Sequence, residues 1–250
     1  MLKKRVIPTL LYKDNKLVKG KNFLSDRPVS SVMESVKMYN IRGVDELIFH
    51  DIQATKKKEE PNYSLISDIS KECFMPLVIG GGITNLKVIE KLLRVGADKV
   101  SINSAAVLNP KFLELASKEF GSQCIIASLD YKKSINYKIF ICSGAKETKH
   151  DLFEISKIFE DAGCGEIMIC SIDQDGMQNG YDLDTIIKVK NLIKTPLICS
   201  GGCGTVEDML EVFKNTDTEA LAAASIFHFS KITPNDAKKI LKKEGINVRT

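Results

Sequence analysis

Two apolar segments of the chain share one pattern: residues 75–84 read MPLVIGGGIT, and residues 195–204 read TPLICSGGCG. The second begins 120 residues after the first, and both place a short apolar run between a proline and a pair of glycines. Three more pairs recur at a spacing of 119 to 121 residues: VIPTLLYKD (6–14) with IIASLDYKK (125–133), DELIFHDI (45–52) with GEIMICSI (165–172), and DKVSINSAA (98–106) with EALAAASIF (219–227). The chain therefore contains an internal duplication.

Short β-branched runs alternate with longer amphipathic segments, which predicts alternating strands and helices. The predicted strands are 5–11, 46–51, 77–80, 99–103, 124–130, 166–171, 197–200 and 219–224. The predicted helices are 30–42, 62–73, 84–95, 110–119, 151–163, 183–193, 205–215 and 234–243. Eight strands, each followed by a helix, indicate an α/β protein of the (β/α)8 or TIM-barrel class, with a doubly wound open sheet as the alternative.

The duplication decides between these two folds. Two similar (β/α)4 halves, about 1–120 and 121–250, close naturally into a ring, whereas an open sheet gives no reason for such regularity. No linker separates the halves, so we predict a single domain over residues 1–250. Thr84, Asn109 and Thr233 are expected to cap helix N-termini. Glycines are expected to stop four helices: Gly43, Gly96, Gly163 and Gly245.

The composition excludes several classes of protein. With 44% hydrophobic and 27% charged residues, it is typical of a soluble globular protein. The net charge of +4 is weak, and the lysines lie beside acids along helices, so we expect no nucleic-acid surface. The apolar run after the basic start is broken by Pro8, and none reaches about 18 residues, so no signal peptide or membrane span is expected. Seven cysteines without a C-x-x-C pair favour a reducing, cytoplasmic location. Three scattered histidines predict no metal site, and we expect no cofactor.

Small residues end the strands of both halves at equivalent places: GGG (80–82) with INS (102–104), and SGG (200–202) with AAS (223–225). Function in such barrels lies at the C-terminal strand ends, where glycine lets backbone amides approach an anion. Tight turns alone also need glycine, but the paired occurrence favours two phosphate cradles, near Gly82 with Ser104 and near Gly202 with Ser225. Two cradles predict an elongated ligand with a phosphate at each end.

Charged residues begin four predicted strands, and we name them the charged quartet: Arg5, Glu46, Lys99 and Glu166. Charges that enter a barrel core must pair. The quartet either caps the barrel floor residue by residue, or forms a mutually satisfied ring that closes a passage along the barrel axis.

Over essentially its full length the chain resembles the HisF-like family, the cyclase subunits of imidazole glycerol phosphate synthase. The segments that carry the resemblance are KRVI, Lys19-Gly20, DELIFHDI, IGGGI, GADKVSIN, AAV, FGSQ, GEIMICSIDQDG, SGG and FHF. The resemblance implies a HisH-like glutaminase bound at the barrel floor, the charged quartet as an ammonia gate, and a carbon–nitrogen lyase or cyclase that uses ammonia from glutamine. It also implies that a phosphorylated small molecule is bound by Lys19, Asp51, Gly82, Asn103, Ser104, Asp175, Gly176, Gly202, Ala224 and Ser225.

Two aspartates, at the ends of the first and fifth strands, carry out acid–base catalysis in that family. Asp130 matches the second of them, but Leu11 occupies the position of the first. Leucine cannot exchange a proton, and Asp14 could replace the missing acid only if its loop folded inward. Losing one such group should lower the rate by about 10²–10⁴-fold.

Three functions follow from these residues. The main interpretation is ammonia delivery to a sugar amidotransferase in acetamidino-sugar synthesis. It rests on Leu11 and on EPNYSLISDISKECFMP (60–76), which resemble the ammonia-channelling barrels of bacterial surface-polysaccharide clusters. The alternative is a genuine imidazole glycerol phosphate synthase subunit of histidine biosynthesis, which accounts for Asp130 and the cradles but not for Leu11. A second alternative is a non-catalytic scaffold that activates the glutaminase.

Overall fold

The strands of the chain form one closed barrel. The computed structural model describes residues 3–133 and 136–249. Within them, eight parallel strands pair in a ring: β1 (Arg5–Lys13), β4 (Leu47–Asp51), β5 (Leu77–Gly80), β6 (Lys99–Ile102), β7 (Ile125–Lys132), β10 (Glu166–Ser171), β11 (Leu197–Ser200) and β12 (Ala220–Ala223). The ring closes because β12 hydrogen-bonds to β1 and β7 to β10. The predicted (β/α)8 barrel is confirmed, and the open sheet is excluded.

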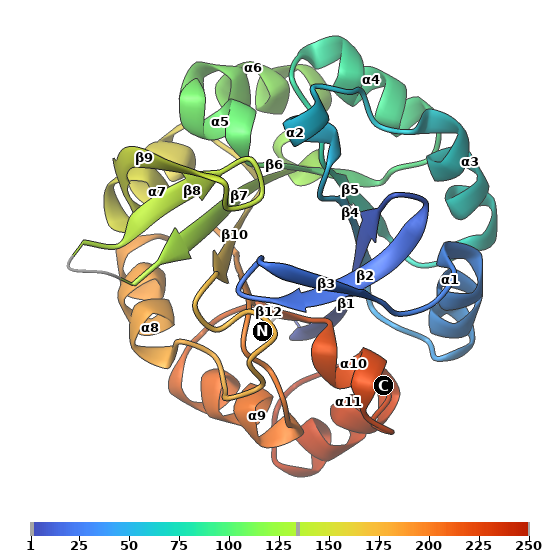
Figure 1. The fold of residues 1–250 in the computed structure, drawn as a ribbon. Coiled ribbons are helices and arrows are strands. Elements are labelled where there is room, and N and C mark those ends of the chain that lie inside the picture. Colours follow the sequence, from blue (N-terminus) through green and yellow to red (C-terminus); the bar gives the residue numbers. More distant parts are fainter. Residues whose placement is uncertain (1–2, 134–135, 250) are drawn as a thin grey trace.

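Helices surround this ring (Figure 1). The eight predicted helices are α1 (Val32–Ile41), α3 (Tyr63–Glu72), α4 (Leu86–Arg94), α6 (Pro110–Phe120), α7 (Leu152–Asp161), α8 (Leu183–Leu192), α9 (Val206–Asn215) and α11 (Pro234–Lys243). Their apolar faces and the outward-facing strand residues form one large hydrophobic core. In the described parts of the chain, no helix has both the length and the apolar character needed to cross a membrane.

A second, smaller core fills the inside of the barrel. Its side chains come from the inward face of every barrel strand except β6, since alternate residues of a strand point to the same side. They are Ile7, Ile48, Val78, Ile126, Met168, Ile198, Ala220 and Ala222, and we call them the apolar layer. In and just before β4, Glu46 precedes Ile48 by two residues and His50 follows it by two. The same strand face therefore leads from the barrel floor through the apolar layer to the strand end.

Helix ends largely follow the predicted signals. Thr233 forms a capping box with Asp236 at the start of α11. Asn109 holds the predicted N-cap position before Pro110 at the start of α6, but its side chain makes no capping hydrogen bond. The prediction for Thr84 is wrong, because the side chain of Asn85 accepts the hydrogen bond from Val88 N and so caps α4 instead. Glycines with positive φ follow the predicted helix ends: Gly43, Gly96, Gly163 and Gly245.

Several short elements at the C-terminal strand ends were not predicted. After β1 comes a hairpin of β2 (Lys16–Lys21) and β3 (Ser25–Pro28), and after β7 comes a hairpin of β8 (Lys138–Ile141) and β9 (Lys146–Asp151). The short helices α5 (Ser104–Leu108) and α10 (Ser225–Phe229) follow β6 and β12, and α2 (Ala54–Lys57) follows β4. The 3-10 turn η1 (Ser122–Cys124), also not predicted, lies at the other end of the barrel, just before β7 begins. The two hairpins and the helices α5 and α10 occupy equivalent places in the two halves, as a duplicated chain requires.

Candidate active site

A single large cavity at the C-terminal ends of the strands brings both halves of the chain together. We call it the mouth cavity. Every predicted ligand-binding residue lines it: Lys19, Asp51, Gly82, Asn103, Ser104, Asp175, Gly176, Gly202, Ala224 and Ser225. Leu11 and Asp130 line it as well. Residues more than 200 positions apart in the sequence thus face one enclosed space, which is the arrangement that a shared ligand needs.

Glycine is required where loop backbones form the wall of the mouth cavity. Gly202 has φ +108°, and a Cβ atom there would collide with the carbonyl oxygen of Gly180. Gly82 has φ +71°, and its Cβ would lie 2.8 Å from the oxygen of Glu59. Side chains are therefore excluded from both walls, and the backbone itself faces the cavity.

The polar groups of the first predicted cradle already have partners within the protein. Gly82 N donates to Thr55 Oγ1 at 3.2 Å. Ser104 Oγ accepts from Cys142 N at 3.0 Å and donates to Asn103 Oδ1 at 3.2 Å. A phosphate at this place would have to share or replace these hydrogen bonds.

Lys19 lies in the cavity wall and is paired there. It extends from β2, is only 3% exposed, and its Nζ lies 2.5 Å from Asp175 Oδ2. Asn22, in the same hairpin, donates from its backbone N to Asp175 O at 2.8 Å and from Nδ2 to Asp173 O at 2.7 Å. The β2–β3 hairpin is therefore bound to the loop that follows β10, and Lys19 is fixed over the cavity.

Asp130 is the acid of the fifth barrel strand, at the end of β7. Burial and, to a smaller extent, the negative charge of Asp175 together raise the pKa of Asp130 to about 7. Asn103 Nδ2 donates to Asp130 Oδ2 at 3.4 Å and to Ser128 O at 3.1 Å. A carboxyl group with such a pKa can exchange a proton near neutral pH.

Leu11 occupies the equivalent place on the opposite side of the barrel, at the end of β1. Asp14 does not replace the missing acid, because it lies at the surface. Its carboxylate is 3.1 Å from Lys57 Nζ and accepts from Gln53 Nε2 at 3.2 Å. It is also absent from the cavity wall among the described residues.

Sequence reasoning missed several residues that line the mouth cavity, namely Thr9, His50, Ser101, Ser128 and Cys170. Among these residues His50 carries an imidazole, and burial lowers the pKa of this group to about 4. Two buried atoms, His50 Nε2 and Thr9 Oγ1, have no hydrogen-bond partner. The two-residue period of a strand could have revealed His50, since it shares a strand face with Glu46, which was predicted to point into the barrel.

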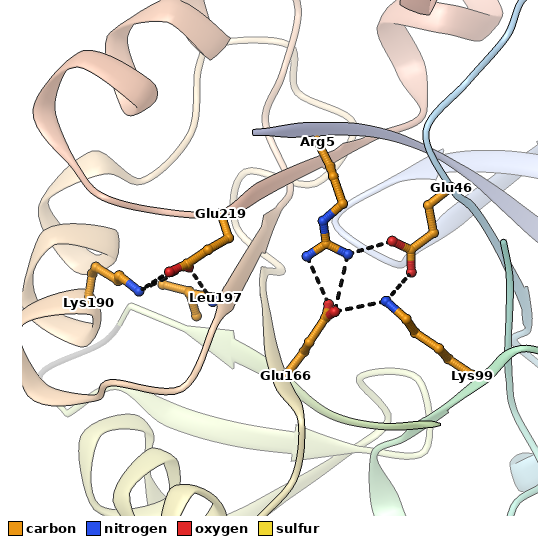
Figure 2. Close-up of polar contacts among 7 residues, drawn as sticks. All are labelled: Arg5, Glu46, Lys99, Glu166, Lys190, Leu197 and Glu219. Carbon is orange, nitrogen blue, oxygen red and sulfur yellow. Dashed lines mark hydrogen bonds and ion pairs between the residues drawn. The ribbon is translucent and has the colours of Figure 1, made fainter. Parts of the chain in front are cut away.

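The charged quartet forms a closed ring at the opposite end of the barrel (Figure 2). The guanidinium of Arg5 lies 2.5 Å from Glu46 Oε2 and 3.1 Å from Glu166 Oε2. Lys99 Nζ lies 2.9 Å from Glu46 Oε1 and 2.8 Å from Glu166 Oε1. Burial alone would lower the pKa of Arg5, but Glu166 and Glu46 more than offset this effect and raise it. Of the two sequence interpretations, the mutually paired ring is the one observed.

A separate ion pair stands beside the quartet on the barrel floor (Figure 2). Lys190 Nζ lies 2.7 Å from Glu219 Oε1, and Glu219 Oε2 accepts from Leu197 N at 2.8 Å. In the first half, Asp98 Oδ2 accepts from Leu77 N at the equivalent place. These acids bind the starts of neighbouring strands together, so they have a structural role outside the quartet.

Comparison with known proteins gives a consistent result. Residues 5–233 match the model of the family described as "Histidine biosynthesis protein". The chain is 39% identical, over the full length of both proteins, to the imidazole glycerol phosphate synthase subunit HisF of Streptococcus mutans serotype c. It is 41% identical, again over both full lengths, to proteins of the same name from two strains of Bacillus cereus.

Proposed function

The chain belongs to the histidine biosynthesis protein family, in its HisF-like branch, and from this premise we propose that it is the cyclase subunit of an imidazole glycerol phosphate synthase. The sequence alone ranked this function behind polysaccharide amidation. The relatives named HisF reverse that order, because they match the chain from end to end at about 40% identity.

The observation that carries the proposal is the composition of the mouth cavity. Asp130, with a pKa raised to about 7, shares one space with Lys19 and with the glycine walls of both halves. Closing an imidazole ring requires a new carbon–nitrogen bond and the loss of water, so a group that donates and accepts protons near neutral pH is needed. The glycine walls suit a ligand with phosphate at both ends.

We further propose that ammonia reaches this cavity along the barrel axis. The charged quartet, the apolar layer and the mouth cavity lie in sequence along one strand face. Ammonia released into neutral water would be mostly protonated and no longer nucleophilic. An enclosed apolar path favours the neutral molecule, because burying a charge without a partner is costly. The quartet would act as the entrance to this path.

A glutaminase bound to the barrel floor would supply the ammonia. On this face, Ile41 and Phe74 are 89% and 85% exposed. Asn40 holds their segments together, since its Nδ2 donates to Glu72 O at 2.8 Å and its Oδ1 accepts from Phe74 N at 3.0 Å. Two large exposed apolar side chains, on segments joined through Asn40, support a protein partner at this face.

The test is the synthase reaction with ammonium as the nitrogen donor. We expect the purified chain to convert the bis-phosphate precursor into imidazole glycerol phosphate at an ordinary enzyme rate, about 1–10 s⁻¹. Restored growth of a histidine auxotroph that carries this gene would agree. Turnover at the level of the no-enzyme control would refute the proposal.

A specific observation keeps ammonia delivery to a sugar amidotransferase as the second candidate. Leu11 lies in the mouth cavity where its counterpart in the other half is Asp130. If the cavity only passes ammonia onward, the second acid is dispensable. This candidate predicts a complex with a glutaminase, background synthase turnover, and ammonia transfer once a sugar amidotransferase is added.

A further inference from the structure

His50 stands directly beside Leu11 in the barrel wall. Leu11 pairs with His50 across β1 and β4, and His50 pairs with Gly80 across β4 and β5. Gly80 in turn pairs with Ser101 on β6, so four neighbouring strands contribute one row of residues that all line the mouth cavity. An imidazole therefore lies one strand away from the position that lacks an acid.

The space for the imidazole is created by Gly80. A Cβ atom at this glycine would lie 2.5 Å from His50 Cδ2 and 2.9 Å from His50 Nε2. Nε2 is buried there without a hydrogen-bond partner, although most buried polar atoms have one. Rotation of the ring about Cβ–Cγ is a broad, roughly two-fold torsion, and it exchanges the positions of Nε2 and Cε1. The imidazole can thus turn Nε2 toward a ligand by this rotation.

The two halves of the barrel show the same pair of positions with different residues. Leu11 and His50 are neighbours on β1 and β4, and Asp130 and Cys170 are neighbours on β7 and β10. Burial raises the pKa of Cys170 far above its ordinary value, so its thiol stays neutral. Each half therefore supplies one group that can exchange protons. In the first half this group is His50 on β4, and in the second half it is Asp130 on β7.

We propose that His50 is the second proton-transfer group of the mouth cavity and works with Asp130 in place of an acid at position 11. This inference rests on the proposed function, because it concerns the addition of ammonia to a carbonyl carbon.

The proton balance of that addition requires two groups. Ammonia donates its lone pair to the carbonyl carbon, and the π electrons move to oxygen. His50 accepts one proton from the new ammonium nitrogen, and the Asp130 carboxyl donates one to the oxygen. The protonated His50 then returns its proton to the departing hydroxyl, which leaves as water while the nitrogen lone pair forms the C=N bond. Asp130 recovers its proton from the iminium nitrogen, so both residues end as they began.

The electrostatics of the mouth cavity suit these roles. With the pKa of His50 near 4 and that of Asp130 near 7, the imidazole is the neutral base and the carboxyl is the acid at mildly acid pH. This order is the reverse of the ordinary one for these side chains. A phosphorylated ligand in the same cavity would favour protonation of His50 by its negative charge.

The experiment measures synthase turnover with ammonium, which removes any contribution of a glutaminase. We expect His50→Leu to lower kcat by about 10²-fold or more, with KM changed by less than about threefold. His50→Gln should be equally slow, and it replaces His50→Leu if that variant does not fold. His150→Leu is the matched control, because His150 lies on β9 outside the cavity wall, and we expect it to retain wild-type kcat.

The substitution Leu11→Asp tests whether His50 transfers protons or only fills space in the cavity. In the wild type, Leu11→Asp should change kcat by less than about fivefold, since His50 already acts. In the His50→Leu background, Leu11→Asp should raise kcat at least about tenfold, because the new carboxyl group replaces the lost proton-transfer group. Equal effects of Leu11→Asp in the two backgrounds, or a His50→Leu kcat within about threefold of wild type, would overturn the assignment.

A second measurement applies if the wild type shows no turnover, which would defeat the proposed function but not by itself the role of His50. The imidazole ¹⁵N shifts are followed against pH by NMR, without ligand and with glycerol phosphate as the probe, and His50→Gln assigns the signals. Proton transfer at His50 predicts that the probe raises its pKa. An unchanged His50 titration would overturn the proposal.

Discussion

Asp130 illustrates how the surroundings of a single residue set its chemistry. It lies at the end of β7 in the wall of the mouth cavity, where burial and the negative charge of Asp175 raise its pKa. Burial is the larger cause, because it penalises the carboxylate form. A raised pKa means that the folded protein binds the proton more tightly than the unfolded chain does. This group therefore lowers stability as pH rises from about 4, its ordinary value, to about 7.

The same shift predicts how activity depends on pH. As the acid, Asp130 is active below about pH 7, so kcat/KM should fall as pH rises through that value. Asp175→Asn removes a negative charge and frees Lys19, and both changes lower the pKa of Asp130. We expect the falling limb of the profile to move to lower pH. Asp173→Asn, in the same loop but outside the cavity wall, is the control and should leave the limb in place. If the falling limb of the pH profile does not move in Asp175→Asn, the charge of Asp175 does not raise the pKa of Asp130.

At the scale of elements, the loops that follow several strands are hydrogen-bonded to one another at the mouth cavity. Gly180 N donates to Gly202 O at 3.0 Å, which joins the loop after β10 to the loop after β11. The β2–β3 hairpin joins the same assembly through Asn22 and Lys19. Because these hydrogen bonds join the loops directly, a change in one loop should move the others.

Gly202→Ala tests this coupling. The added methyl group would collide with Gly180 O at a φ of +108°, so the wall must open. We expect at least about tenfold weaker binding of glycerol phosphate by calorimetry, and about 1–3 kcal/mol lower stability in denaturant unfolding. Gly163→Ala is the control, because it has φ +77° but nothing within 4 Å of the new Cβ. Gly163→Ala should lower the stability but leave the binding of glycerol phosphate unchanged. Equal binding by both variants would show that the glycine serves only the turn.

At the scale of the whole molecule, the barrel joins two functional ends through one apolar layer. The charged quartet lies at the strand starts, the mouth cavity lies at the strand ends, and no linker or second domain separates them. A partner on one end could therefore communicate with a ligand at the other through the barrel axis.

Lys99→Ala should uncouple ammonia transfer from glutamine hydrolysis in the complex with a glutaminase. Lys99 contacts both Glu46 and Glu166, so its loss leaves two acids underpaired and opens the ring. We expect glutamate release to exceed product formation several-fold, while turnover with added ammonium stays near wild type. Lys190→Ala removes the neighbouring floor ion pair instead, and should leave the ratio at one. A ratio of one in both variants would assign the quartet a structural role only.

Phe74→Glu should weaken the complex with the glutaminase. A charge at the exposed rim of Ile41 and Phe74 would have to be desolvated on binding, which we expect to cost at least about tenfold in affinity. Leu108→Glu, at a side chain that is 66% exposed at the end of α5, is the matched control and should bind normally. Size-exclusion chromatography and titration calorimetry of the mixed proteins measure the difference.

The sequence by itself determined the barrel and most of its landmarks. The recurrence of MPLVIGGGIT as TPLICSGGCG, together with the period of the apolar residues, predicted all eight barrel strands and the eight long helices, with boundaries shifted by at most two residues. These are local properties, since hydrophobic period, caps and glycine stops are encoded within a few residues. The predicted strand starts and strand ends also placed the charged quartet at one end of the barrel and the predicted cradles at the other.

The tertiary structure alone decided which side chains meet and in what state. The hairpins β2–β3 and β8–β9 escaped prediction because short polar strands depend on contacts with distant loops, such as those of Asn22 with Asp173 and Asp175. His50 looked like an isolated histidine until ring closure placed it between Leu11 and Gly80. The pKa of Asp130 depends on burial and on Asp175, 45 residues away in sequence. Burial and charge act through space, and a linear pattern does not contain those distances until the barrel closes.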